Sequence, residues 1–429
     1  MNLLLILFGN LLSGISRFFN FGSGSTWPGH IALSVNKNFI KDLLKNSKTK
    51  IILIAGTNGK TTTGRLIQTI LEKNGRKVFQ NQAGANLLNG IASSLISNSS
   101  LLGKIEKDFA IFEIDENTLP LVLKEIDNPS FIIILNLFRD QLDRYGEVNT
   151  ISRKWSEAFK KLSKQTTLIL NADDPQVAYL ALHLEGANVN YFGINAKNSA
   201  NKIQHASDSI YCPNCSAKLF YKTICFSHLG DWSCGECGYK HPQKTFTSFP
   251  FYPLSGTYNE YNTNAAVLLA QTIGFEKEKI IVSLKDFKPV FGRQEILNIN
   301  GIRVQIFLSK NPTGFNESLK TIINLGAKNL LLLLNDRIPD GRDVSWIWDV
   351  DFEDFSSKFR NVVVSGDRVF DMGLRLKYAE FRSFETEKKL ANAVNMAISK
   401  TPKNETLYIL TTYSAMLDVR KILTGKKIL

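Results

Sequence analysis

The most specific chemical signal in the sequence is a glycine-rich loop that ends in a lysine and two threonines. It consists of Gly56-Thr57-Asn58-Gly59-Lys60-Thr61-Thr62. Glycines let backbone N–H groups turn inward around phosphate oxygens, and the N-terminus of a following helix adds partial positive charge. Lys60 can neutralise the outer phosphates, and the hydroxyl of Thr61 can hold Mg²⁺. The loop predicts a nucleoside triphosphate site, although Ile54 stands where the longer form of this motif has its first glycine.

Carboxylates that could complete a magnesium site follow the next strongly apolar run. Glu113 is the penultimate residue of the run Phe109–Ile114, and Asp115 and Glu116 come directly after the run. Because the carboxyl ends of neighbouring parallel strands meet at one crevice, we expect Glu113 to face the phosphate loop. With Thr61, Glu113 is the predicted magnesium ligand; it would hold a second ion between the γ-phosphate and a substrate carboxylate. Glu116 fits a solvated loop better.

Four of the five cysteines form two Cys-x-x-Cys pairs, and this spacing is typical of a zinc ribbon. The predicted ligands are Cys212, Cys215, Cys234 and Cys237. Four thiolates complete a tetrahedron and leave no open position, which indicates a structural rather than a catalytic Zn²⁺. His228 and His241 lie near enough to compete as ligands, Cys225 is predicted to be a buried apolar residue, and a redox disulfide is the alternative for the pairs. The odd count and the spacing favour a reducing cytoplasm.

The elements that must position these residues alternate between short apolar runs and amphipathic stretches. Predicted strands at Ile51–Ala55, Phe109–Ile114, Phe131–Leu135 and Thr167–Leu170, with a helix over Thr61–Lys73, indicate a parallel sheet covered by helices. A second block has predicted strands at 304–308, 330–334, 362–364 and 407–411, and predicted helices at 316–325, 369–377 and 414–423. We therefore predict an α/β fold with three parts. They are an N-terminal helix and lead-in segment (1–45), a central nucleotide-binding domain (46–290) with a zinc-ribbon insertion (206–247), and a smaller Rossmann-like domain (291–429).

The net charge and the N-terminal segment indicate which kinds of partner the protein could bind. The formal net charge is +13, which favours anionic partners, but no nucleic-acid-binding motif is present and nucleic acid is not expected. The apolar stretch Met1–Phe19 lacks a basic start and a cleavage site, so it does not fit a signal peptide. It is also interrupted and short for a membrane span. A helix packed on the protein's own surface is the favoured interpretation, and a patch that touches a membrane is the alternative.

Several segments, in order, resemble the Mur ligase superfamily. They are Asn136–Asp143, with Gln141 at the position of a usual His; Asn171-Ala172-Asp173-Asp174-Pro175; Gly256–Asn262, with Tyr258 replacing a His; Gly292-Arg293-Gln294-Glu295; and Ser309-Lys310-Asn311-Pro312. The resemblance implies a ligase that uses ATP and Mg²⁺ to form an acyl phosphate. It also implies that the nucleotide contacts Asn171, Asp174, Asn259, Asn262 and Arg293.

Where the sequence departs from the common pattern of the superfamily, it is similar to the MurT-type members. The segments Ser25–Gly29, Arg139–Glu147 and Asp343–Asp349 and the cysteine insertion carry this likeness, and no UDP-sugar-binding domain precedes the phosphate loop. The resemblance implies amidation of the α-carboxyl of D-glutamate in lipid II, with ammonia from a GatD-type glutaminase subunit. It further implies a cytoplasmic protein, with the inner face of the cell membrane as the place where it meets its substrate.

A second cluster of acids lies near the end of the chain, where Trp346 and Trp348 are interleaved with aspartates. Such a segment is either an acidic surface loop over packed aromatics or a docking face for the glutaminase. The resemblance implies that one aspartate completes the Cys–His pair of the glutaminase, either Asp343 or Asp349, with Asp349 slightly preferred.

Two other functions fit part of the pattern. The first is another amide ligase of the amino-acid-adding or folylpolyglutamate type, against which the insertion and the missing N-terminal domain argue. The second is a nucleotide-binding scaffold without chemistry, against which the intact loop and Glu113 argue.

Overall fold

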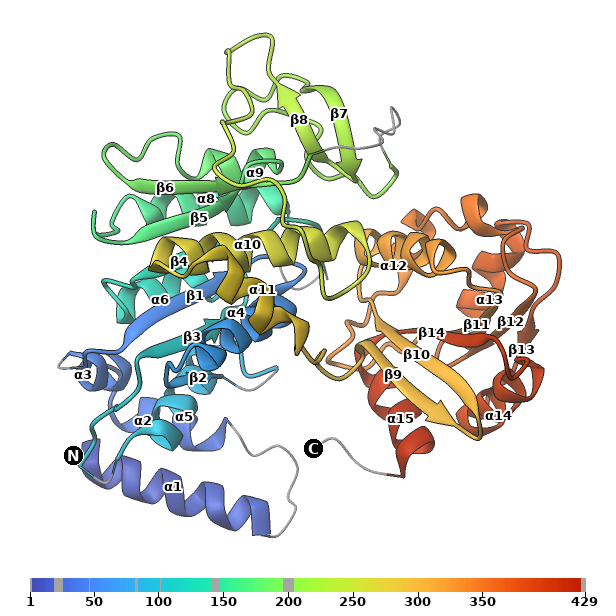
Figure 1. The fold of residues 1–429 in the computed structure, drawn as a ribbon, viewed down its shortest axis with the longest axis horizontal. Helices are drawn as coiled ribbons and strands as arrows, with labels where there is room; N and C mark the ends of the chain where they lie inside the picture. Colours follow the sequence, from blue (N-terminus) through green and yellow to red (C-terminus); the bar gives the residue numbers. More distant parts are fainter. Residues whose placement is uncertain are drawn as a thin grey trace.

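The computed structural model describes residues 2–18, 26–45, 47–81, 84–100, 102–140, 147–195 and 204–425. Its first domain is built on a six-stranded parallel sheet of order β2-β3-β1-β4-β5-β6 (Figure 1). The strands are β1 (Lys50–Ala55), β2 (Val78–Gln80), β3 (Phe109–Glu113), β4 (Phe131–Ile134), β5 (Thr167–Asn171) and β6 (Asn188–Phe192). Apolar runs such as Ile51–Ala55 form these strands because both faces of a parallel sheet are buried.

Helices cover both faces of this sheet. One face packs against α4 (Lys60–Lys73), α10 (Thr257–Ile273) and α11 (Lys277–Lys285). The other face packs against α5 (Leu88–Asn98), α6 (Leu119–Glu125), α8 (Val148–Phe159) and α9 (Pro175–Tyr179). Alternate residues of β1 point into the two cores, with Ile52 in one and Leu53 in the other. The phosphate loop follows β1, which lies inside the sheet between β3 and β4.

Three short helices precede the sheet: α1 (Asn2–Phe18), α2 (Trp27–Val35) and α3 (Phe39–Leu44). α1 packs on α2 and α5 through Ile6 and Gly9, and Figure 1 shows it at the lower edge of the first domain. The favoured prediction, a helix packed on the protein's own surface, is confirmed. Within the described residues, no helix combines the length and apolar content that a crossing of the bilayer requires.

The cysteine-rich segment forms a small lobe beyond β6 and α9, at the top of Figure 1. Its core is the antiparallel pair β7 (Phe220–Phe226) and β8 (Leu229–Ser233). Trp232 anchors the lobe because its indole Nε1 donates to the carbonyl of Ala172 at 3.2 Å, and Tyr239 adds a hydrogen bond from its hydroxyl to the carbonyl of Pro175 at 2.8 Å.

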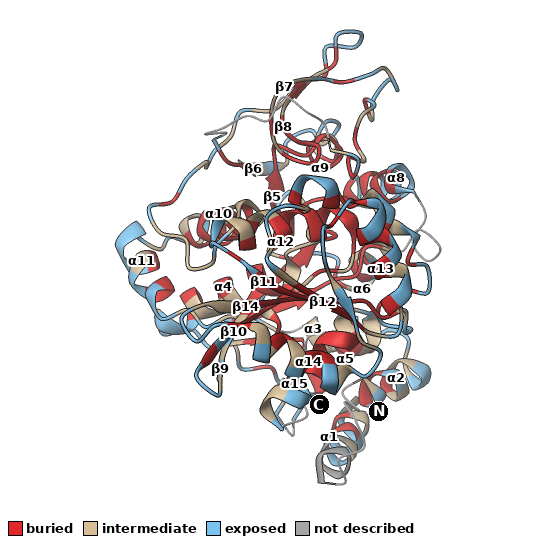
Figure 2. Ribbon diagram, turned by 90° about the vertical axis from the view of Figure 1, so that its right-hand side faces the viewer, coloured by how far each residue is buried: buried red, intermediate tan, exposed pale blue. Residues whose placement is uncertain are grey.

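The second domain is another six-stranded sheet, of order β13-β12-β11-β14-β10-β9. Its elements are β9 (Arg293–Ile299), β10 (Ile302–Leu308), α12 (Pro312–Asn324), β11 (Asn329–Leu333), η1 (Ser345–Asp349), η2 (Phe352–Phe355), β12 (Asn361–Ser365), α13 (Val369–Tyr378), β13 (Glu385–Thr386), α14 (Leu390–Lys400), β14 (Thr406–Thr411) and α15 (Tyr413–Thr424). All pairings are parallel except β9 with β10. Figure 2 shows buried residues along its central strands, and α12 and α13 cover one face while α14 and α15 cover the other.

All eight strands predicted from apolar runs are present, shifted by at most two residues at an end. The predicted helices at 316–325, 369–377 and 414–423 correspond to α12, α13 and α15. The sequence patterns did not predict β2, β6, β7, β8, β9 or β13. Of these, β9 lies at the edge of its sheet, and most of its residues are partly buried or exposed. Of the resembling stretch Asn136–Asp143, residues 141–143 lie outside the described part of the chain.

Candidate active site

The phosphate loop is held in shape by two glycines and by the segment that follows β4. Gly56 (φ +133°) and Gly59 (φ +94°) adopt backbone conformations that side chains rarely reach. A Cβ on Gly59 would lie 2.1 Å from Oδ1 of Asn262, so no larger residue fits. The N–H of Asn58 donates to Oδ1 of Asn136 at 2.8 Å, and the hydroxyl of Thr57 donates to the carbonyl of Phe138 at 3.0 Å. The sequence thus fixes a loop that opens directly onto the N-terminus of α4.

Lys60 begins α4, and its ammonium group points back toward the loop. Its Nζ donates to the carbonyl of Gly56 and to Oε1 of Glu116 at 3.1 Å. The prediction that Glu116 belongs to a solvated loop is wrong: its side chain is buried, because the chain after β3 turns inward beneath α8, where Trp155 donates to the carbonyl of Glu116. Burial acts to raise the pKa of Glu116, but attraction to Lys60 and Lys310 outweighs it and leaves the pKa below its usual value.

Thr61 and Glu113 meet as the sequence predicts. The hydroxyl of Thr61 donates to Oε2 of Glu113 at 2.7 Å, and Oε1 of Glu113 is buried without a hydrogen-bond partner. Burial raises the pKa of Glu113, against the hydrogen bond from Thr61 and the charges of Arg293 and Lys60. A buried carboxylate oxygen without a partner costs free energy unless a cation binds it. The pair therefore fits the oxygen ligands that Mg²⁺ prefers.

The loop and Glu113 line a cavity of about 620 Å³ between the two domains. The second domain contributes Arg293, from the start of β9, and Lys310, from the loop after β10. Lys310 forms an ion pair with the buried Asp140 of the first domain, and the side chains of Asn58 and Asn311 also join across the boundary at 3.0 Å. The attraction to Asp140 and Glu116 outweighs the effect of burial and raises the pKa of Lys310. Both domains therefore build the wall of one site.

Two of the asparagines predicted to contact the nucleotide reach the same cavity. Asn259 and Asn262 lie one turn apart on α10, and the amide of Asn262 donates to Oδ1 of Asn259 at 3.1 Å. Tyr258, which replaces a His of the related pattern, lines the cavity and accepts a hydrogen bond from Gln294 at 2.9 Å. Burial raises the pKa of Tyr258 to about 12, so it stays a neutral phenol near pH 7.

Asn171 and Asp174 have a different environment. Both are fully buried and do not line the cavity. The amide of Asn171 donates to the carbonyl of Leu135 at 2.8 Å, and Asp174 caps α9 by accepting from the N–H groups of Gln176 and Val177. Their contacts hold β5 and α9 together, and nucleotide contact stays a prediction for both.

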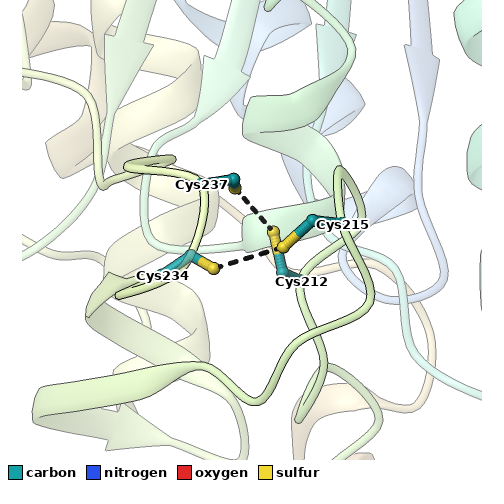
Figure 3. A group of neighbouring side chains, drawn as sticks. All are labelled: Cys212, Cys215, Cys234 and Cys237. Carbon is teal, nitrogen blue, oxygen red and sulfur yellow. Dashed lines mark hydrogen bonds between the residues drawn. The ribbon is translucent and has the colours of Figure 1, made fainter.

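The four predicted zinc ligands lie together. The sulfurs of Cys212, Cys215, Cys234 and Cys237 are within 4.8 Å of one another (Figure 3). All five cysteines are free, so neither pair is a disulfide. His228 and His241 pair instead with aspartates; for His241, Nε2 lies 2.8 Å from Oδ1 of Asp173. Cys225 packs, partly buried, against the core beneath the lobe. The donor set suits one tetrahedral Zn²⁺ with four thiolates.

The aspartates of the second domain lie outside the cavity lining. Asp343 accepts from the N–H of Ser345, the first residue of η1, at 2.8 Å. Asp349 ends η1, its side chain is 41% exposed, and it lies 3.4 Å from Nη2 of Arg139. Of the two tryptophans, Trp346 packs on Phe315, whereas Trp348 is half exposed. The segment thus combines a packed aromatic with an exposed one.

Three charged residues at this site had no role in the prediction from sequence. Glu116, Asp140 and Lys310 form a network with Lys60. A signal existed for Lys310, because Lys310 stands in the short segment Ser309–Pro312 that resembles the Mur ligase superfamily, but its partner lies 170 residues earlier.

Comparison with known proteins assigns this architecture to a family. The sequence model of the Mur ligase middle domain matches residues 54–270, and that of the MurT ligase C-terminal domain matches residues 308–416. The chain therefore belongs to the Mur ligase family, a class of ATP-dependent ligases with this parallel α/β fold, and it is an enzyme.

Its particular group within that family is the MurT subunits. The chain is 35% identical to the lipid II isoglutaminyl synthase (glutamine-hydrolyzing) subunit MurT of Staphylococcus aureus strain COL, covering 83% of each chain. It is 32% identical to the subunit of the same name from Streptococcus pneumoniae strain R6, covering 97% of each chain.

Solved structures show the same fold. A pseudomurein peptide ligase type C from Methanothermus fervidus superposes with a TM-score of 0.65 at 24% identity, covering 90% of this chain and 81% of that one. FolC of E. coli, in complex with DHPP and ADP, superposes with a TM-score of 0.59 at 15% identity, covering 90% and 92%. The predicted Mur ligase fold is confirmed.

Proposed function

We propose that this chain is the synthetase subunit of a lipid II isoglutaminyl synthase, which acts in peptidoglycan synthesis at the cytoplasmic face of the cell membrane. It converts the α-carboxylate of D-glutamate in the lipid II stem peptide to an amide. The carboxylate attacks the γ-phosphorus of ATP and ADP leaves. Ammonia from a GatD-type glutaminase subunit then attacks the acyl carbon, and inorganic phosphate leaves with the bonding electrons.

The observation that carries this proposal is the meeting of Thr61, Glu113 and Lys60 in a cavity that the second domain completes with Arg293 and Lys310. Thr61 and Glu113 would hold Mg²⁺, which offsets negative charge on the phosphates. Lys60 and Arg293 are positioned to stabilise charge on the transferring group, and the loop amides to orient it. Lys310, brought by the second domain, is suited to bind the acyl phosphate or the substrate carboxylate.

Co-purification with the glutaminase followed by mass analysis of the lipid tests this function. With Mg-ATP and glutamine, lipid II is expected to change from acid to amide, with ADP formed in equal amount. A product that gains an amino acid instead would indicate an amino-acid-adding ligase. Binding of ATP without consumption dependent on lipid II would indicate a scaffold, and either result would overturn the proposal.

We also propose that the four cysteines hold a structural Zn²⁺. The lobe they organise supports the central domain, because Trp232 and Tyr239 bond to the chain on either side of Asp174. Without the ion, the two cysteine loops lose the bond that joins them, and a small lobe of this kind has little core of its own.

Purified protein is expected to contain one zinc per chain, and Cys212→Ser or Cys237→Ser to lose it. The unfolding temperature of either variant should fall by roughly 5 °C or more. Cys225→Ser is the matched control, since it lies in the same lobe and should keep its zinc. Elemental analysis and thermal unfolding measure both quantities, and full zinc content in Cys212→Ser would exclude the four-cysteine site.

The glutaminase, we propose, docks beside η1 and α13. Phe370, Leu374 and Tyr378 repeat every four residues along α13 and are 61%, 49% and 67% exposed, so they form one apolar stripe. Trp348 extends the stripe, with its ring 5.5 Å from that of Tyr378. Aromatic side chains of this kind often anchor protein interfaces. Asp349 lies directly beside Trp348 and would orient the catalytic His of the partner.

Asp349→Asn is expected to reduce glutamine-dependent amidation by the complex by roughly 10²–10⁴-fold, because an amide cannot stabilise an imidazolium as a carboxylate does. Activity with added ammonia should be unchanged. Asp343→Asn is the control: an asparagine oxygen can still accept from the N–H of Ser345, so both activities should stay near wild type. Equal losses of Asp349→Asn with both nitrogen sources would contradict the role, and a loss confined to Asp343→Asn would transfer it to Asp343.

A further inference from the structure

α1 presents an uninterrupted apolar face to solvent. Leu3, Leu4, Leu7, Phe8 and Leu11 are 46%, 71%, 45%, 48% and 60% exposed. They fall on one side of the helix, since their spacings of one, three and four residues place them within a single arc. Ile6 and Gly9 lie on the opposite side and pack against the protein. We call the five exposed residues the α1 face.

The composition of this face is unusual for a soluble surface. Residues 2–12 contain no charged side chain, and the polar ones, Asn2 and Asn10, lie outside the exposed arc. Single exposed leucines are common, but a contiguous apolar patch marks a contact surface. Leu102, which is 74% exposed, extends the patch, because the adjoining Gly103 lies against Leu3 and Ile6.

The rim of the patch carries lysines and also one acid, Asp42, whose Oδ2 accepts a hydrogen bond from the amide of Asn2 at 3.3 Å. Lys104 is exposed in the loop that touches Leu3. At the other side, the amide of Asn36 donates to Oδ1 of Asn2 at 2.9 Å, which places the exposed Lys37 near the N-terminus of α1. Apolar side chains bordered by lysines match the hydrocarbon edge and the phosphates of an anionic bilayer. The 17 residues of α1 reach about 25 Å, less than the hydrocarbon core, so α1 suits a position parallel to the surface.

The helix that carries this face packs, by its opposite side, on two helices that reach the cavity. α1 rests on α2 and α5, and both helices start at the cavity: Thr26, the residue before α2, and Leu87, the residue before α5, line it. Trp27, the first residue of α2, is 66% exposed beside that edge. A bilayer in contact with α1 would therefore be separated from the cavity edge only by the helices α2 and α5 on which α1 rests.

We propose that the α1 face docks the protein on an anionic lipid bilayer and brings the cavity edge to the head group of a lipid-linked substrate. The docking stands on the geometry of α1 alone; the identity of the substrate rests on the proposed function. A second copy of this chain is the competing occupant, but each copy carries a formal net charge of +13, which opposes such pairing and favours an anionic surface.

Sedimentation of the full chain with vesicles tests the docking. Wild type should bind vesicles of phosphatidylglycerol and phosphatidylethanolamine, and bind less to phosphatidylcholine alone or at high salt. Leu4→Gln combined with Phe8→Gln and Leu11→Gln should reduce the bound fraction by roughly tenfold or more, because three apolar insertions are lost. Val282→Gln, at a residue 65% exposed on α11, is the control and should bind as wild type.

Three results would overturn the proposal. Wild type could stay in solution with anionic vesicles, the triple variant could bind as wild type, or ultracentrifugation without lipid could show a wild-type dimer that the triple variant abolishes. A parallel assay separates this inference from the proposed function. The triple variant should amidate vesicle-embedded lipid II at least tenfold more slowly, yet amidate detergent-dispersed lipid II normally. Vesicle binding without any amidation by wild type would refute the proposed function and leave the docking intact.

Discussion

Lys60→Ala is expected to reduce ATP-dependent amidation of lipid II by roughly 10³-fold in kcat, with the fold retained. The ammonium group is held at the phosphate loop by the carbonyl of Gly56 and by Glu116, inside the cavity that the proposed function assigns to ATP. Removing one preorganised charge from such a site costs several orders of magnitude in rate. The measurement is ADP formation dependent on lipid II, by the complex with the glutaminase.

Lys73→Ala provides the control for Lys60→Ala. Lys73 ends the same helix, and its exposed ion pair with Asp286 contributes little, so this variant should turn over as wild type. Circular dichroism and zinc content should be unchanged in both proteins. Turnover of Lys60→Ala within a few-fold of wild type would remove the phosphate loop from the chemistry and refute the ligase mechanism.

Glu113→Gln is expected to lower kcat by roughly 10²–10³-fold and, at the same time, to stabilise the ligand-free protein at neutral pH. Glutamine can still accept the hydrogen bond from Thr61, but it cannot offer a charged oxygen to Mg²⁺. The increase in unfolding temperature that Mg-ATP gives to the wild type should therefore be absent. Activity assays and thermal unfolding with and without Mg-ATP measure the two effects.

The stabilising effect follows from the direction of the pKa shift. Burial raises the pKa of Glu113 in the folded state, so the native protein binds more protons than the unfolded chain between the usual carboxyl pKa and the raised value. The free energy of unfolding of the wild type then falls as the pH rises through that window. Glu113→Gln lacks this dependence, so its advantage should appear near pH 7 and vanish at acid pH.

An exposed acid of α4 provides the comparison. Glu72→Gln makes the same change from carboxylate to amide, but at a residue exposed to solvent. This variant should leave both the activity and the response to Mg-ATP unchanged. If Mg-ATP still raised the unfolding temperature of Glu113→Gln, Glu113 would not be a metal ligand. If the variant also retained its activity, the magnesium site would have to be formed by other carboxylates of the cavity.

Local patterns predicted the parts of the site that lie close together in sequence. The phosphate loop follows directly from the order of Gly59, Lys60 and Thr61 between a strand and a helix. Glu113 followed from one general property, that parallel strands end at one edge. The cysteine cluster followed from spacing alone. In each case the chemistry constrains a short segment, so the residue types carry the information.

Such local patterns could not predict contacts between residues that lie far apart in the sequence. Asp140 and Lys310 are ordinary charged residues until the two domains meet, and Glu116 is exposed or buried according to how the chain turns after β3. For the N-terminal stretch, the prediction was limited for another reason. Nearly all its residues are apolar, so periodicity could not tell which side of α1 packs against the protein. Only the positions of α2 and α5 decide that the side with Ile6 is covered and the side with Leu4 is not.

The cavity between the domains has an electrostatic consequence that the total charge of the chain conceals. Although the protein carries +13 overall, the described residues of the cavity wall include four carboxylates, Glu113, Asp115, Glu116 and Glu317, against the three cations Lys60, Arg293 and Lys310. A bare triphosphate would thus meet no surplus of positive charge. The nucleotide has to arrive already neutralised in part, so its affinity should rise steeply with the concentration of free divalent ion, and metal-free ATP should act as a poor competitor.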